Sequence, residues 1–109
     1  MSEFDQSRSE LTREELERIE GPVLVEFGAT WCGHCQALAP RLAALLDALP
    51  SVRHIKVEDG PGRPLGRSFR VKLWPTLVFM KDGQVLKQVS RPAIEEVQAG
   101  LEAIAESPG

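Results

Sequence analysis

The sequence of 109 residues is short of cysteine, of net positive charge and of long apolar runs. A net charge of -3 leaves no broad basic surface, which argues against nucleic acid and anionic lipid as partners. No stretch reaches the roughly eighteen apolar residues that span a bilayer, and charges interrupt the N-terminal region where a secretory signal needs an apolar core. We therefore expect a cytoplasmic protein with no membrane partner.

What the chain contains is typical of one compact domain. Its hydrophobic content of 42% and charged content of 27% are those of a globular protein, and the length suffices for a single core. No repeat or linker divides it, and a monomer is the default expectation. Residues 1–10 are polar apart from Phe4, and we expect them to be frayed or to form at most a short edge strand.

Both cysteines lie in one motif, Trp31-Cys32-Gly33-His34-Cys35. The motif separates a β-rich run from an amphipathic helical run, so the cysteines fall on the first turn of a helix, where their sulfurs can meet in a disulfide. Unpaired N–H groups and the helix dipole at that end favour a thiolate. We predict that Cys32 is the exposed nucleophile and that Cys35, one turn deeper, is the resolving thiol.

Hydrophobic periodicity and turn residues predict the remaining elements. Thr12 and Glu15 are spaced as a capping box for a first helix, and Asp82-Gly83 is a hairpin turn between two β-rich segments. Helices are predicted for residues 13–19, from the cysteine motif to residue 49, for residues 64–69, and from Pro92 onward. Strands are predicted for residues 23–27, 52–58, 76–80 and 85–89. This order predicts an α/β fold whose central mixed β-sheet has helices on both faces.

Glu26 is the one acid in the otherwise apolar strand 23–27. Burial disfavours the charged form of a carboxyl group, and such a group suits acid-base catalysis near neutral pH. Two other interpretations stay open, because Glu26 could face solvent at a strand edge or pair with Lys56 for structure alone.

The motif, the apolar strand before it, Pro40 in the following helix and Pro75-Thr76 before the hairpin together resemble the thioredoxin family. The resemblance covers roughly residues 12–106 and leaves 1–11 as a polar N-terminal segment and 107–109 as a tail. Residues 25–40 look especially like the catalytic modules of protein disulfide isomerases, which share Trp-Cys-Gly-His-Cys. A thioredoxin fold is thereby implied.

The resemblance also implies an enzyme, a thiol-disulfide oxidoreductase that exchanges disulfides with protein substrates. Cys32 would attack, Cys35 would resolve the mixed disulfide, and Glu26 would move the proton of Cys35, with Lys56 as the partner of that acid. No cofactor beyond the Cys32-Cys35 dithiol is implied, and a reductase or oxidant of unknown identity would recycle the protein.

Substrate binding is implied for the segment Trp74-Pro75-Thr76. In the family the peptide bond before the matching proline is cis, and the backbone of Trp74 would pair with an extended substrate. Three departures from the family lie on this face: Gly28 replaces a frequent aromatic and should open the region, Leu73-Trp74 is bulky, and Ser90-Arg91-Pro92 stands where a glycine is common. Trp74 could be exposed to partners or could pack over the motif.

His34 and Trp31 complete the candidate site. An imidazole between the cysteines can hydrogen-bond or pair with the Cys32 thiolate, which stabilises the reduced form and raises the reduction potential. Trp31 is expected both to shield the motif and to contact substrate. Two other classes stay open: a redox-sensitive binding module with little turnover, and a metal site in which His34 or His54 joins the cysteines. No second ligand pair supports a metal, and His54 reads as an ordinary strand residue.

Overall fold

A computed structural model describes residues 11–105 of the chain, and the predictions made for residues 1–10 and 106–109 lie outside the described residues. The order of helices and strands is the predicted one. The helices are α1 (Arg13–Glu17), α2 (Gly33–Asp47), α3 (Pro64–Ser68) and α4 (Ile94–Ala105), and the strands are β1 (Pro22–Gly28), β2 (Arg53–Glu58), β3 (Thr76–Lys81) and β4 (Gln84–Ser90).

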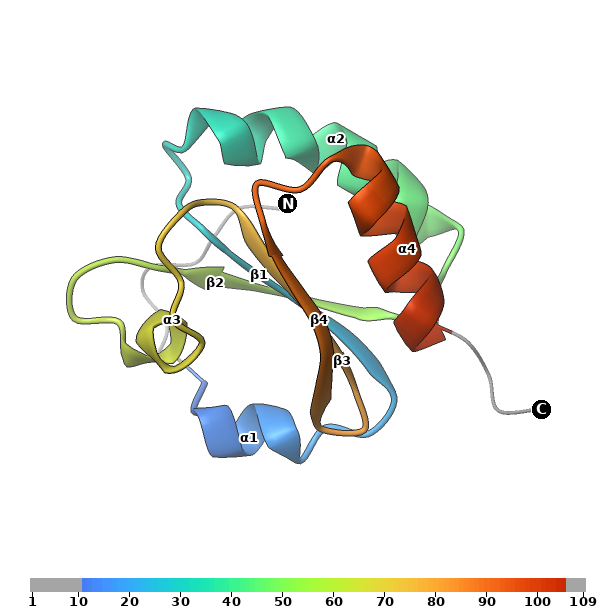
Figure 1. Cartoon of the computed structure of the whole chain (residues 1–109), viewed down its shortest axis with the longest axis horizontal. Helices are drawn as coiled ribbons and strands as arrows, with labels where there is room; N and C mark the ends of the chain where they lie inside the picture. Colours follow the sequence, from blue (N-terminus) through green and yellow to red (C-terminus); the bar gives the residue numbers. More distant parts are fainter. Residues whose placement is uncertain (1–10, 106–109) are drawn as a thin grey trace.

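The four strands form one mixed sheet in the order β2-β1-β3-β4, which confirms the predicted fold class. β1 runs parallel to β2 and antiparallel to β3, and β3 pairs with β4 as an antiparallel hairpin. Helices α2 and α4 cover one face of the sheet, while α1 and α3 lie on the other (Figure 1). Within the described residues, no helix is long and apolar enough to cross a bilayer.

The alternation of β1 divides the core into two layers. Val23, Val25 and Phe27 belong to the cluster that contains Leu16 of α1 and Leu65 of α3. Leu24 belongs to the cluster of α2 and α4. Because successive side chains of a strand point to opposite faces, Glu26 lies on the same face as Leu24, beneath α2. The one acid of β1 is thus directed toward the helix that begins at the cysteines.

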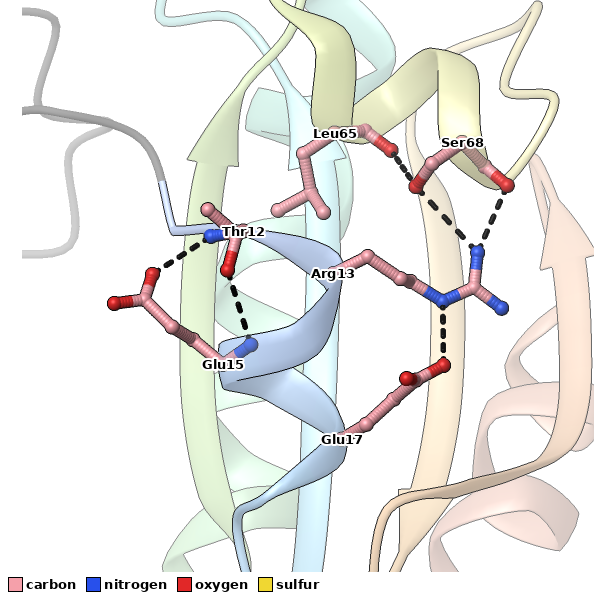
Figure 2. Close-up of polar contacts among 6 residues, drawn as sticks. All are labelled: Thr12, Arg13, Glu15, Glu17, Leu65 and Ser68. Atoms are coloured by element: carbon pink, nitrogen blue, oxygen red, sulfur yellow. Dashed lines mark hydrogen bonds and ion pairs between the residues drawn. The ribbon is translucent and has the colours of Figure 1, made fainter.

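α1 has only five residues, and it is held by local capping and by one long-range contact. Thr12 Oγ1 accepts from the backbone N–H of Glu15, and the Glu15 carboxylate accepts from the N–H of Thr12, so the predicted capping box is present (Figure 2). Arg13 reaches α3, where its Nη1 donates to the Ser68 carbonyl oxygen at 2.8 Å. The helix ends at Glu17, two residues before the predicted Ile19.

The hairpin has the predicted two-residue turn. Asp82 and Gly83 have φ angles of 51° and 82°, both in the left-handed region that this tight turn requires. The Asp82 carboxylate accepts from the N–H of Gly21 at 2.8 Å, so the hairpin is tied to the start of β1. At the other end of the hairpin, α4 begins at Ile94 rather than at the predicted Pro92.

Candidate active site

Cys32 and Cys35 lie at the start of α2 as two free cysteines. Cys32 is the N-cap residue, and its Sγ accepts a hydrogen bond from the backbone N–H of Cys35 at 3.2 Å. An acceptor at this position satisfies one of the unpaired N–H groups of the first turn and is stabilised when it carries negative charge. The expected position of Cys32 at the tip of the helix is therefore confirmed.

The expectation that Cys32 is exposed is wrong. Only 7% of its surface is accessible, against 4% for Cys35. The cause is distant in sequence, because the side chain of Trp74 packs against the small cluster that Ala29 and the two cysteines form. The indole ring of Trp74 is thus part of the cover over Cys32.

Burial raises the pKa of Cys35 from its ordinary value of 9.0 to about 12. That value of about 12 already includes the smaller effects: a hydrogen bond with the Cys32 side chain and the nearby negative charges of Cys32 and Glu26 raise the pKa, whereas a backbone hydrogen bond with Ala29 lowers it. Cys35 consequently keeps its proton at neutral pH. The deeper thiol needs a proton acceptor before it can attack.

Trp74 is held in place from two sides. Its indole N–H donates to Oδ2 of Asp59 at 2.8 Å, and its ring meets that of Trp31 edge to face, with centroids 5.2 Å apart. The backbone N–H of Asp59 donates to the carbonyl oxygen of Gly28, so the indole bound to Asp59 lies near Gly28. This is the region that we expected to be open, because Gly28 lacks the aromatic side chain that is frequent in the family. Gly28 is buried, and the region is not open.

Glu26 is buried, with 1% of its surface accessible, so the interpretation of a solvent-facing acid is wrong. Its Oε1 lies 2.7 Å from Nε2 of His54 on the neighbouring strand β2. Lys56 is the register partner of Glu26 across β1 and β2. His54 and Lys56 are two residues apart and therefore project to the same face. The sequence interpretation missed the role of His54, although this spacing from Lys56 was a usable signal.

The loop before β3 carries the proposed substrate segment. The peptide bond between Trp74 and Pro75 is cis, and Pro75 is buried. Thr76 is fully buried, and its hydroxyl bonds to the Leu73 carbonyl and to Oγ of Ser90. The Thr76 side chain thus holds the loop to the end of β4. Any contact of Thr76 with a substrate would come from its backbone.

Gly33 and His34 open α2 between the cysteines, and both are exposed. The hydrogen bond from His34 to Cys32 that the sequence suggested is not found among the described residues, so an effect of His34 on Cys32 would act through charge. No group of three or more His, Cys, Asp and Glu side chains able to hold a metal occurs within residues 11–105. His54 is occupied by Glu26 instead.

A buried dithiol that caps a helix, above a buried acid on a mixed four-stranded sheet, defines a thiol-disulfide oxidoreductase. The thioredoxin family model matches residues 5–103. The chain is 38% identical over 85 residues to thioredoxin Asp f 28 of Aspergillus fumigatus, which covers 77% of this chain and 79% of that protein. The chain belongs to the thioredoxin family, whose members need no cofactor beyond their own dithiol.

Solved structures and other curated proteins agree with this assignment. The structure of thioredoxin 2 from Pseudomonas aeruginosa PAO1 in its reduced form superposes with a TM-score of 0.80 at 48% identity, over 95% of each chain. Protein disulfide-isomerase A2 of Pongo abelii is 52% identical over 65 residues, which is 56% of this chain but only 12% of that protein. The likeness to the isomerase is thus confined to one segment.

Proposed function

We propose that this thiol-disulfide oxidoreductase exchanges disulfides with protein substrates by a two-step reaction in which Cys32 attacks and Cys35 resolves. The observation that carries the proposal is the asymmetry of the pair. Cys32 Sγ accepts the N–H of Cys35 at the positive end of the α2 dipole, whereas the pKa of Cys35 is raised to about 12. One sulfur is prepared to attack while the other is kept as a thiol.

In the first step the Cys32 thiolate attacks one sulfur of a substrate disulfide. A bond forms between Cys32 and that sulfur, the substrate S–S bond breaks, and the other substrate sulfur leaves as a thiolate. The neighbouring apolar surface suits a protein partner, because Trp31 and Leu73 are 68% and 48% exposed. Trp31 therefore serves as a contact surface and Trp74 as the wall beside the sulfurs.

The second step needs a proton to leave Cys35. Glu26 lies beneath α2 and its charge already acts on Cys35, so its carboxylate is the proposed acceptor. The new Cys35 thiolate attacks the sulfur of Cys32, the mixed disulfide breaks, and the second substrate sulfur leaves as a thiolate. Two electrons have then passed from the dithiol to the substrate. His54 and Lys56 are proposed to position Glu26 from β2.

The proposed setting is a monomer in the cytoplasm, recycled by a separate reductase or oxidant. We also propose that His34 makes the disulfide a stronger oxidant than a proline at this position would, because protonated imidazole favours the reduced form. Equilibration with glutathione tests this: the variant His34→Pro should show a lower potential than the parent, and an equal or higher value would reject the idea.

A trapping experiment tests the reaction itself. With Cys35→Ser, attack by Cys32 cannot be followed by resolution, so mixed disulfides with protein substrates should accumulate and should be released by dithiothreitol. The variant Cys32→Ser is the matched control and should trap nothing. If instead the double variant lacking both cysteines still retained the same partners, the chain would be a redox-sensitive binding module rather than an exchange enzyme.

A further inference from the structure

A groove beside the dithiol has a charge that differs from that of the chain as a whole. It encloses about 200 Å³ between the start of α2, the loop at Pro75 and the segment that follows β4. Among its lining residues are His34, Arg41 and Arg91, and no acidic residue lines it. The chain carries 16 acidic and 13 basic residues, so two arginines without an acid in this groove oppose the overall balance.

Arg91 occupies this groove in a conformation that favours glycine. Its φ angle is 48°, in the left-handed region that a side chain makes unfavourable. Such a conformation persists only where the surrounding structure holds it. Two hydrogen bonds fix it: its backbone N–H donates to the Pro75 carbonyl at 2.7 Å, and its Nε donates to the Trp74 carbonyl at 3.0 Å.

This arrangement leaves the outer part of the guanidinium available. Within residues 11–105, Nη1 and Nη2 of Arg91 make no hydrogen bond, and Arg41 has neither a hydrogen bond nor an ion pair. Both arginines are exposed. A guanidinium presents paired N–H groups that match the two oxygens of a carboxylate. The Trp74 carbonyl has a second lone pair and can still accept an N–H from a substrate backbone.

We infer that this groove binds the carboxylate of an aspartate or glutamate close to the disulfide of the protein substrate, with Arg91 and Arg41 as its two cations. The inference rests on the proposed function, because the groove has this meaning only if a substrate disulfide is presented to Cys32. It makes the preferred substrates acidic on one side of the reacting cysteine. Arg91 thus becomes a specificity-determining residue that also fixes the loop beside the dithiol.

The test measures the second-order rate constant for reduction of disulfide peptides by the pre-reduced protein in a single turnover. Three peptides differ only in having Glu, Gln or Lys at one position near the disulfide. The parent protein should reduce the Glu peptide about tenfold faster than the Gln peptide, and the Lys peptide more slowly still. The difference should shrink as salt is added, because the pairing is electrostatic.

Three variants assign the effect to the groove. Arg91→Gly suits the positive φ angle, so it should stay folded and lose most of the preference; Arg41→Gln should lose part of it. Arg53→Gln is the matched control, because it also removes one positive charge. Arg53 pairs with Val23 at the end of the sheet away from the motif, so this variant should keep the preference for the Glu peptide. Equal rates for the three peptides, or a preference that persists in Arg91→Gly, would overturn the inference. Failure to reduce any peptide would instead reject the proposed function.

Discussion

Trp74 and Asp59 are joined by a 2.8 Å hydrogen bond from the indole N–H to Oδ2, which ties the loop before β3 to the residue that follows β2. This bond holds the ring that packs against the cysteine cluster. We therefore expect the accessibility of Cys32 to depend on a side chain 42 positions further along the chain and on the acid that anchors it.

Asp59→Ala should release this ring. Loss of a hydrogen bond to a charged acceptor is expected to lower the free energy of unfolding by about 2 kcal/mol. Cys32 should also react faster with iodoacetamide, because the indole no longer covers it. Denaturant unfolding and alkylation rates measure the two effects, and Asp59→Asn, which retains an oxygen acceptor, is the control. Unchanged alkylation in Asp59→Ala would mean that Trp74 stays in place without its anchor.

Gly66→Ala should disturb the same bond from the other side. Alanine normally stabilises a helix by about 1 kcal/mol relative to glycine. At this position, however, a Cβ would lie 2.1 Å from Oδ1 of Asp59. The net effect should be destabilising in the parent and should become neutral or stabilising in the Asp59→Ala background. A double-mutant cycle of unfolding free energies checks this, and additive effects would contradict it.

The raised pKa of Cys35 predicts a pH dependence of stability in the reduced protein. Between the ordinary value of 9.0 and about 12, the unfolded chain has lost this proton while the folded chain retains it. The unfolded state then binds fewer protons, so stability falls as pH rises, by about 1.4 kcal/mol per pH unit across the window. Below pH 9 this contribution is constant. The measurement is the difference in unfolding free energy between the parent and Cys35→Ala; a flat difference would reject the prediction.

Glu26→Gln should slow the release of substrate from the mixed disulfide and leave its formation nearly unchanged. Loss of the proposed proton acceptor is expected to reduce the release rate on the order of 100-fold. Rapid-quench analysis of the mixed disulfide separates the two steps. His54→Gln and Lys56→Met then compare the two basic residues, and we expect the larger effect at His54 because it bonds directly to Glu26. Equal slowing of both steps would indicate a structural role for the acid.

Gly100→Ala should destabilise the fold although the site lies in the interior of α4. A Cβ there would lie 2.5 Å from the ring of Phe79, which is fully buried in β3. Overpacking of this kind is expected to lower the free energy of unfolding by about 1–3 kcal/mol. In a Phe79→Leu background, Gly100→Ala should cost less stability than it does in the parent, because the smaller side chain leaves room for the added Cβ. Chemical denaturation of the two single variants and the double variant measures the free energies of unfolding.

Local signals explain why most of the fold could be predicted from the sequence. The capping box of Thr12 and Glu15, the Asp82-Gly83 turn and the apolar strand around Val25 each depend on residues close together in the chain. The β-rich run before the motif and the amphipathic helical run after it place the two cysteines at a strand-to-helix junction. This position predicts a dithiol that exchanges with other disulfides. The ends of helices are harder to predict, because local backbone geometry and not composition determines the last helical residue. α1, for example, ends at Glu17 and not at the predicted Ile19.

The site was harder to predict where its contacts are long-range. The pairing of Glu26 with His54 depends on the register between two parallel strands, which no short pattern encodes. The burial of Cys32 depends on where the Trp74 ring comes to rest, and that is set by Asp59. Residue types alone therefore did not reveal the contact of Glu26 with His54 and left the orientation of Trp74 undecided.

Because Cys32 is the N-cap of α2 and also the proposed nucleophile, substitutions at this position mix folding with chemistry. Serine and alanine replacements should both abolish exchange, yet only serine supplies a side-chain oxygen that can accept a hydrogen bond from the Cys35 N–H. Comparing the thermal stabilities of those two proteins would measure how much a capping acceptor at this position contributes to the fold. Engineers who wish to silence this protein while preserving its shape should accordingly choose serine.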